Sequence, residues 1–467
     1  MSSVSTFARG LTPSPPEHRQ PEQTTAYHQY MHPHRILAGG AGLAALLALT
    51  ACAAEPTQQL RSGQEYEPAS LSEAAALQEV VSATTEFGAE SLAEVAQQQN
   101  VVLSPASILV ALAMLAEGAA GPAADELADL LGASGTERTE AFSALQAAVL
   151  TYDGDPALVQ EEDLPDTPLL HLANQLVLSD AAAPEEEFLD VLASAYDAGM
   201  VTTDFTSAES KQVLDEWVNE HTGGLVEESA VETPDPELVF VLQNAILMAA
   251  QWQMQFDPSQ TTDRDFTTAA GETVEAEMMQ QTLEAAYTEH DDAQVIRLPY
   301  TEAFAMDIVL PSGNGTGTEA PMQDWTAQDW TLQDWTAQDW EAVDTAFAGE
   351  AETAVDLTLP RVDIETSEVL VSLLQGMGAV ETVAGNDLSR IDPAVEISQV
   401  AHQAVLTIDE QGTVAAAVTE VAGVTSAPVE PPEAVEMTVD RPYLVRIVHK
   451  ETNWPLFMAF IADPTAG

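Results

Sequence analysis

Apolar residues in the first part of the chain repeat with the spacing of helices. Leu109, Leu112 and Ala113, for example, follow the i, i+3, i+4 spacing that places side chains on one buried helical face. Similar spacing predicts helices within residues 71–132, 186–198, 207–221 and 365–377. Gly378 comes directly after the last of these segments and is typical of a helix end.

Apolar runs in the later part of the chain have the length and composition of strands. The continuous run Leu238–Leu247 suits a central strand that is covered on both faces. Further strands are expected at His171–Leu178, Val295–Leu298, Ala305–Leu310, Val355–Leu359, Val400–Ile408, Glu436–Val439, Tyr443–Val448 and Leu456–Ile461. Because helices come early and strands dominate later, the predicted fold class is α+β with large antiparallel sheets.

The remaining polar segments divide the chain. Residues 1–52 form an N-terminal extension that ends in an export signal, and residues 53–72 are a flexible tether containing proline, glutamine and glycine. Residues 73–467 then form a single domain, in which the acidic stretch 152–168 is expected to be a surface loop.

A short repeat occupies most of an insertion at residues 313–345. It places Trp325, Trp330, Trp335 and Trp340 five residues apart. Five residues turn a helix by about 500°, so the four rings cannot share one narrow face. We therefore expect a recently expanded repeat in a tolerant surface segment. A patch that binds sugar or a partner protein is the alternative.

The charge balance limits the partners of the protein. The chain has 76 acidic and 13 basic residues, which gives a net charge of −63. Such a chain repels nucleic acids and anionic membranes. Self-repulsion would also strain the folded state unless salt screens it, since the Debye length falls to about 3 Å near 1 M salt. A salt-rich habitat is one hypothesis, and simple solubility of a secreted protein is the other.

The single cysteine, Cys52, excludes a disulfide within the chain and suggests a lipid anchor. An apolar run at residues 36–51 follows Arg35 and leads directly to Cys52, as in bacterial lipoprotein signals. The run is short for a membrane-spanning helix. We expect an extracellular protein that begins at lipidated Cys52 and touches the membrane only through this lipid. Met31 is well placed as the true start, and an ordinary signal peptide or a buried cysteine is the alternative.

Short motifs stand in a fixed order over residues 75–465. They are Asn100–Ser107 (NVVLSPAS), Glu117–Ala119, Trp217–Asn219, Thr222–Gly224, Asn244–Leu247, Met278–Gln280, Leu298–Tyr300, Leu310–Pro311, Leu359–Arg361, Arg441–Tyr443 and Pro455–Met458. Each motif alone is weak, but their joint order resembles the serpin family. One departure is Val362, which stands where the family usually has an aromatic residue.

The resemblance implies about nine helices around three β-sheets, with an exposed reactive-centre loop. It also implies a monomeric inhibitor of a serine protease rather than an enzyme, with no cofactor. The protease would cleave the loop and form a covalent acyl complex, after which the freed loop would insert into a sheet. A non-inhibitory binding lipoprotein with the same fold is the alternative.

The segment Glu410–Thr419 (EQGTVAAAVT) is similar to the hinge of inhibitory serpins. In such a hinge Gly412 would let the backbone pivot. Alternate residues of an inserted strand face opposite sides, and every inward position here carries a small side chain. The inward positions are Thr413, Ala415, Ala417 and Thr419, whereas Val414, Ala416, Val418 and Glu420 would face outward.

The family pattern also implies the position of the reactive bond. Inhibitory serpins are usually cut after the seventeenth residue when the hinge glutamate is the first, which here places the bond between Ser426 and Ala427. Gly423, Val424 and Thr425 precede it, and none is basic or aromatic. Small side chains suit the shallow pockets of elastase-like or subtilisin-like proteases.

In the serpins the positions of Ser104, Ser107, Asn244 and His402 form a hydrogen-bonded cluster beneath the sheet that admits the loop. The position of Trp252 packs where the loop first enters, although a plain core role is the alternative. A hydrolase with Ser104 as nucleophile and His402 as base is a rival interpretation, but the chain has no G-x-S-x-G motif. His171, His221 and His290 show no metal-ligand spacing, so no metal site is expected.

Overall fold

The structure, a computed structural model, describes residues 57–466 apart from 97, 162–163, 313–331, 350–351, 386, 393–394, 396 and 414–433. The helices in this part of the chain are α1 Leu77–Val95, α2 Pro105–Glu117, α3 Gly121–Leu131, α4 Gly135–Leu150, α5 Glu186–Tyr196, α6 Glu209–His221, α7 Ala337–Phe347, α8 Val371–Gly376 and α9 Val380–Val383. No helix among the described residues is long and apolar enough to cross a membrane.

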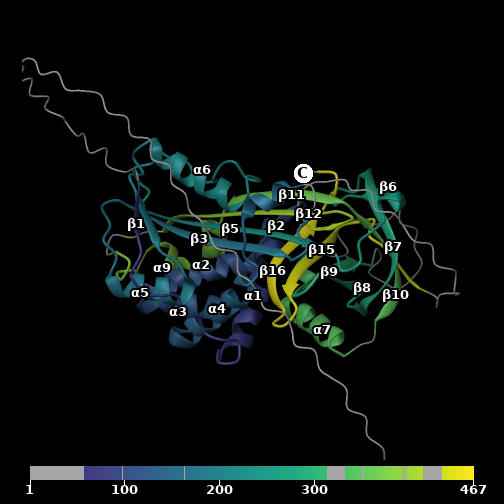
Figure 1. Cartoon of the computed structure of the whole chain (residues 1–467), viewed down its shortest axis with the longest axis horizontal. Helices are drawn as coiled ribbons and strands as arrows, with labels where there is room; N and C mark the ends of the chain where they lie inside the picture. The colour runs from purple at the N-terminus through teal and green to yellow at the C-terminus, as the bar shows by residue number, and fades with distance from the viewer. Residues whose placement is uncertain are drawn as a thin grey trace, which may run out of the picture. The chain divides into compact units, whose positions relative to one another are not determined.

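Seven strands form the first sheet. Their order is β1 Thr57–Leu60, β4 Met200–Thr203, β3 Leu169–Ser179, β5 Phe240–Gln251, β13 Gly412–Thr413, β12 Ile397–Ile408 and β11 Val362–Val369. The helices α2, α3, α4 and α5 lie on one side of this sheet and α6 lies on the other (Figure 1). The central strand β5 is therefore buried on both faces, as its continuous apolar run predicts.

Nine strands form the second sheet. Along its path these are β14 Val435–Thr438, β10 Thr353–Pro360, β7 Thr273–His290, β8 Ala293–Pro299, β9 Phe304–Pro311, β15 Tyr443–His449, β16 Trp454–Ile461 and β2 Val101–Leu103, with β6 Thr262–Thr267 paired to β7. The long strand β7 pairs with β6 and β10 at its first part and with β8 at its end. It thereby joins two of the three expected sheets into one.

Two of the predicted segments are wrong in part. The predicted helix 365–377 begins only at Val371, because residues Val362–Val369 form β11 and pair along their whole length with β12. Burial alternates along the start of β11, which is a strand pattern that the helical interpretation missed. The predicted tether also contains β1, which extends the first sheet by pairing with β4.

The Trp repeat is likewise not confined to the surface. Trp335 and Trp340 are buried against the second sheet, and their rings meet edge to face with centroids 5.6 Å apart. Trp340 also covers the guanidinium of Arg446 at 4.2 Å, and that guanidinium is itself buried and paired with Asp307. The last two repeat units are therefore part of the core, whereas the first two lie outside the described residues.

Candidate functional site

The first sheet has a seam between β5 and β12. These two strands run parallel and pair directly from Phe240 and Ile397 to Ile246 and Ala404. Beyond this point β13 lies between them. It is antiparallel to both, with Gly412 opposite Gln251 of β5. Gly412 and Thr413, the third and fourth residues of the predicted hinge, thus already occupy the open end of the seam between β5 and β12.

A tight turn brings the hinge into this position. The carboxylate of Asp409 accepts hydrogen bonds from the backbone N–H groups of Gln411 and Gly412, at 2.8 and 3.0 Å. Gly412 packs so closely on the backbone of Ala250 that a Cβ atom would overlap its carbonyl oxygen. The structure therefore gives a second reason for glycine at this position, in addition to freedom to pivot.

Glu410 fixes the base of the hinge to the neighbouring sheet. Its carboxylate is 5% exposed and accepts hydrogen bonds from Arg361 Nε and Nη2 at 2.9 and 2.8 Å. Thr261 donates a further hydrogen bond from its hydroxyl. These contacts outweigh burial and lower the pKa of Glu410. The sequence indicated Glu410, but it gave no role to Arg361, 49 positions earlier.

Two stacked aromatic rings form the floor under the hinge. The rings of Trp252 and Tyr300 lie 4.4 Å apart and nearly parallel. Trp252 Nε1 donates to the carbonyl of Asp409 at 2.8 Å, and the Tyr300 hydroxyl contacts the hydroxyl of Thr413. Trp252 thus touches the hinge turn directly. Tyr300, which belongs to the quoted motif Leu298–Tyr300, was not singled out from the sequence.

A buried polar cluster spans the seam beneath the hinge. His402 of β12 and Asn244 of β5 are direct neighbours, and His402 Nδ1 lies 2.7 Å from Asn244 Oδ1. The other ring nitrogen, Nε2, accepts the backbone N–H of Ser104 at 3.0 Å. The amide of Asn244 donates to the Ser107 hydroxyl and, at 2.5 Å, to Asn174 of β3. All four residues singled out from the sequence therefore meet in one cluster.

These contacts fix the protonation state of the histidine. Because Nε2 accepts a hydrogen bond, the proton of the neutral ring is on Nδ1, which donates to Asn244. Complete burial lowers the pKa of His402 to about 3. Ser104 meets the ring through its backbone N–H, while its hydroxyl caps α2 by accepting from the N–H of Ser107 at 3.1 Å. This is not the geometry of a nucleophile and its base.

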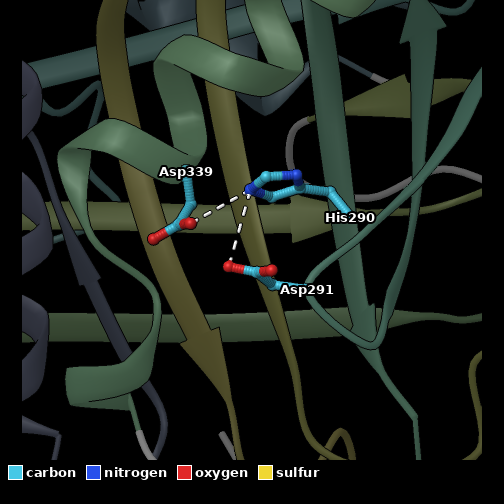
Figure 2. Close-up of side chains that lie close together, drawn as sticks. All are labelled: His290, Asp291 and Asp339. Atoms are coloured by element: carbon cyan, nitrogen blue, oxygen red, sulfur yellow. Dashed lines mark hydrogen bonds and ion pairs between the residues drawn. The ribbon is translucent and has the colours of Figure 1, made fainter.

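A possible metal site lies elsewhere. Figure 2 shows His290 at the end of β7, Asp291 in the following turn and Asp339 at the start of α7. Among the described residues these are the three whose ligand atoms lie close enough, within 4.8 Å, to share one ion. Spacing along the chain did not indicate this group, because Asp339 comes from the distant Trp repeat. Asp339 already caps α7 through Thr336 and pairs with His290 at 3.0 Å, so the group also ties α7 to the sheet.

The protein-family model described as "Serpin (serine protease inhibitor)" matches residues 82–464, which include the seam, the hinge turn and the polar cluster. The chain belongs to the serpin family. An uncharacterized serpin-like protein from Thermococcus kodakarensis is 29% identical over 397 residues, covering 83% of this chain and 86% of that protein. Iripin-8 from Ixodes ricinus is 30% identical over 372 residues, covering 78% and 87%.

Solved serpin structures share the fold. The thermophilic serpin tengpin in its native state superposes with a TM-score of 0.71 at 22% identity, covering 88% of this chain and all of that one. Thyroxine-binding globulin in complex with thyroxine superposes with a TM-score of 0.67 at 24% identity, and the match covers 82% of this chain and 99% of that one. The α+β serpin fold is thus confirmed. Members of the family are generally protease inhibitors rather than enzymes, and the fold is shared by thyroxine-binding globulin.

Some predicted site residues lie outside the described part of this serpin. They are Cys52, Ala415, Ala416, Ala417, Thr419, Ser426 and Ala427. The hinge can therefore be followed from Glu410 to Thr413, and the roles of the later loop residues remain predictions. The expected absence of a cofactor also remains a prediction.

We expect His402→Ala to destabilise the protein. Removing the ring leaves the buried partners Asn244 and Ser104 unsatisfied, which costs about 1–3 kcal/mol. Thermal unfolding should show a lower melting temperature, together with faster polymerisation on warming. The matched control is His290→Ala, which removes a partly exposed ring on the second sheet together with its contact to Asp339 and should lower the melting temperature less. Equal melting temperatures for His402→Ala and the unmodified protein would contradict the buried role.

Glu410→Lys should open the base of the hinge. Two cations would then face each other. Breaking a fully buried ion pair costs about 3–5 kcal/mol of folding free energy, and the loss here should be smaller because Arg361 is partly exposed. We expect a lower melting temperature and faster spontaneous loop insertion on native gels. The double variant Arg361→Glu/Glu410→Lys restores opposite charges at this pair and should recover part of the stability; the rest is lost because Arg361 also pairs with Glu277 at 3.1 Å. If the swap recovers nothing, the ion pair is not what holds the hinge.

Proposed function

We propose that this serpin inhibits a serine protease by inserting its cleaved loop along the seam between β5 and β12. The supporting observation is that Gly412 and Thr413 already lie between these strands, while the strands still pair with each other below. Insertion would replace the parallel pairing of β5 with β12 by two antiparallel pairings, so the sheet would gain one strand and its backbone hydrogen bonds. The loop in its uninserted position would thus store free energy that cleavage releases.

The register of β13 fits the small inward side chains. Thr413 lies opposite Ala250, which faces the main core, and its hydroxyl is buried against Tyr300. Continuing this register would place Ala415 opposite Met248 and Ala417 opposite Ile246, both core residues. About fourteen inserted residues at ~3.3 Å each would carry the acylated protease some 46 Å along the sheet.

The decisive experiment is a panel of elastase-like, subtilisin-like, chymotrypsin-like and trypsin-like proteases. An inhibitor gives gel-stable covalent complexes, and its cleaved form melts at a much higher temperature than the intact protein. Cleavage with neither result would favour the non-inhibitory alternative. The likeness to thyroxine-binding globulin keeps that alternative open, but the small residues of the hinge favour inhibition.

Thr413→Arg should turn the inhibitor into a substrate. The arginine would have to enter the sheet beside Tyr300, where an unpaired charge costs several kcal/mol. We expect the variant to be cleaved at an unchanged rate while the covalent complex disappears. The control Thr413→Val keeps the size of the side chain and should still trap the protease. Full trapping by Thr413→Arg would refute insertion at this position.

We propose that the protease cuts between Ser426 and Ala427. Because Ser426 is small, elastase-like or subtilisin-like enzymes should be trapped and trypsin should not. Mass spectrometry of the peptide released on complex formation locates the cut. Ser426→Arg provides the primary-pocket cation that trypsin prefers and should gain trypsin trapping. Release of a peptide that starts outside residues 425–428 would show that the reactive bond lies elsewhere.

We further propose an extracellular monomer held at the membrane by lipid on Cys52. Mass spectrometry of detergent-extracted protein should find acylated Cys52 as the first residue. Cys52→Ser should remove the anchor and prevent lipoprotein processing. An unmodified thiol at Cys52 in the membrane fraction would contradict this proposal, while leaving the inhibitory mechanism untouched.

A further inference from the structure

Helix α6 bridges the seam on the face opposite the main core. Its residue Leu214 shares a buried apolar cluster with Val177 of β3, Val241 of β5 and Ala401 of β12. Gln243 of β5 adds a hydrogen bond to the backbone carbonyl of Leu214 at 3.2 Å. Parting β5 from β12 therefore also disturbs the surface on which α6 rests.

A chain of titratable groups fastens the end of α6 to the sheet. Asp153, in the turn after α4, lies with Oδ1 2.6 Å from His171 Nδ1. His171 Nε2 in turn lies 2.8 Å from Nδ1 of His221, the last residue of α6. Trp217 packs on the His221 ring with centroids 4.6 Å apart, and the His171 side chain is 13% exposed. These three side chains thus link the end of α4 to the end of α6 through β3.

The contact between the two imidazoles depends on their protons. A nitrogen-to-nitrogen hydrogen bond needs one protonated and one unprotonated atom. Once both rings are fully protonated, N–H faces N–H and two positive charges oppose each other at close range. The hydrogen bond between His171 and His221 is then lost.

The surroundings of His221 determine how readily this happens. Burial and the nearby His171 lower the pKa of His221, while Glu220 and Asp153 oppose that shift. A lowered pKa means that the docked ring binds fewer protons than the free ring. The contact between the two rings therefore stabilises α6 on the sheet fully above about pH 6.5, which is the pKa of a free histidine. Its contribution weakens as the pH falls below that value.

The latch, defined as Asp153, His171 and His221, lies next to the proposed path of the loop. His171 is directly opposite Leu247 on β5. If the register of β13 continues, Val414 and Ala416 would emerge opposite Ala249 and Leu247, which cluster with Val159 and Leu169 on the face opposite the main core. Two inserted side chains would thus appear on the same face as the latch, with only β5 between them and His171 on β3.

We propose that this latch makes loop insertion pH-dependent: with the pair neutral it holds α6 against the sheet, and double protonation releases α6 and accelerates insertion. The part that concerns α6 stands on the geometry alone, and the part that concerns insertion rests on the proposed inhibitory function. The latch would keep the loop out at neutral pH and favour rapid trapping, or inactivation, in an acidic environment.

The experiment measures the two parts separately in the full chain. Hydrogen exchange of peptides from residues 209–221 is compared at pH 7.5 and 5.0, as protection relative to the intrinsic exchange rate. Spontaneous loop insertion on warming is followed on native gels at the same pH values. His221→Asn keeps a neutral hydrogen-bonding group at the position of Nδ1 but cannot be protonated. His449→Asn, which changes a buried histidine that contacts Thr452 instead, is the matched control.

We expect protection of α6 to fall severalfold at pH 5.0 in the unmodified protein and in His449→Asn, with insertion accelerating in parallel. Both effects should be absent in His221→Asn. Equal pH dependence in His221→Asn overturns the latch. Release of α6 without faster insertion, in a protein that does trap proteases, overturns its coupling to the loop. If α6 is released but no protease is trapped at any pH, the latch stands and the proposed inhibitory function fails.

Discussion

The structure depends on a seam that must hold and yet must be able to open. β5 and β12 are parallel neighbours in the middle of the first sheet, and a third strand begins to separate them at one end. If apolar packing alone held β5 against β12, opening the seam would expose apolar surface gradually, and no single contact would decide whether the seam is open or closed. Instead, polar contacts fasten it at separate points, and each of these contacts is either made or broken.

The polar contacts differ in what could release them. The cluster around His402 is fully buried and neutral, and the low pKa of its histidine keeps it insensitive to ordinary changes of pH. The pair of Glu410 and Arg361 is charged and lies at the base of the hinge, where the loop must pivot. The pair of His171 and His221 is partly buried and ties the end of α6 to β3. Buried polar networks stabilise only when every member is satisfied, so the loss of one partner has a large effect.

Much of this arrangement could be predicted from the sequence because it is local. The apolar run of β5 and each of the ordered motifs lie within a few residues. The order of the motifs resembles the serpin family, and that resemblance implied the hinge and the four residues of the polar cluster. What could not be predicted depends on contacts across long separations. Arg361 reaches Glu410 only because β10 ends beside the hinge, and Tyr300 reaches Thr413 only through the fold.

Two segments were misjudged for a related reason. Residues 365–369 have a pattern that fits helix or strand, and pairing with β12 decides for the strand. Trp335 and Trp340 are part of a repeat with no helical stripe, which suggested a surface segment. They are buried because the second sheet and the Arg446 guanidinium offer them a matching surface. In both cases tertiary contacts override the local pattern.

The acidity of the chain explains where its few cations are placed. Carboxylates pair with Arg138, Lys211, Arg297, Arg361, Arg441 and Arg446, several of which are largely buried. Arg446 in particular is completely buried and holds Asp307 and Asp344 together beneath Trp340. Salt screens charges at the surface far more than buried pairs. A rise in salt would therefore relieve the repulsion among surface carboxylates while leaving these internal pairs, and with them the base of the hinge, largely intact.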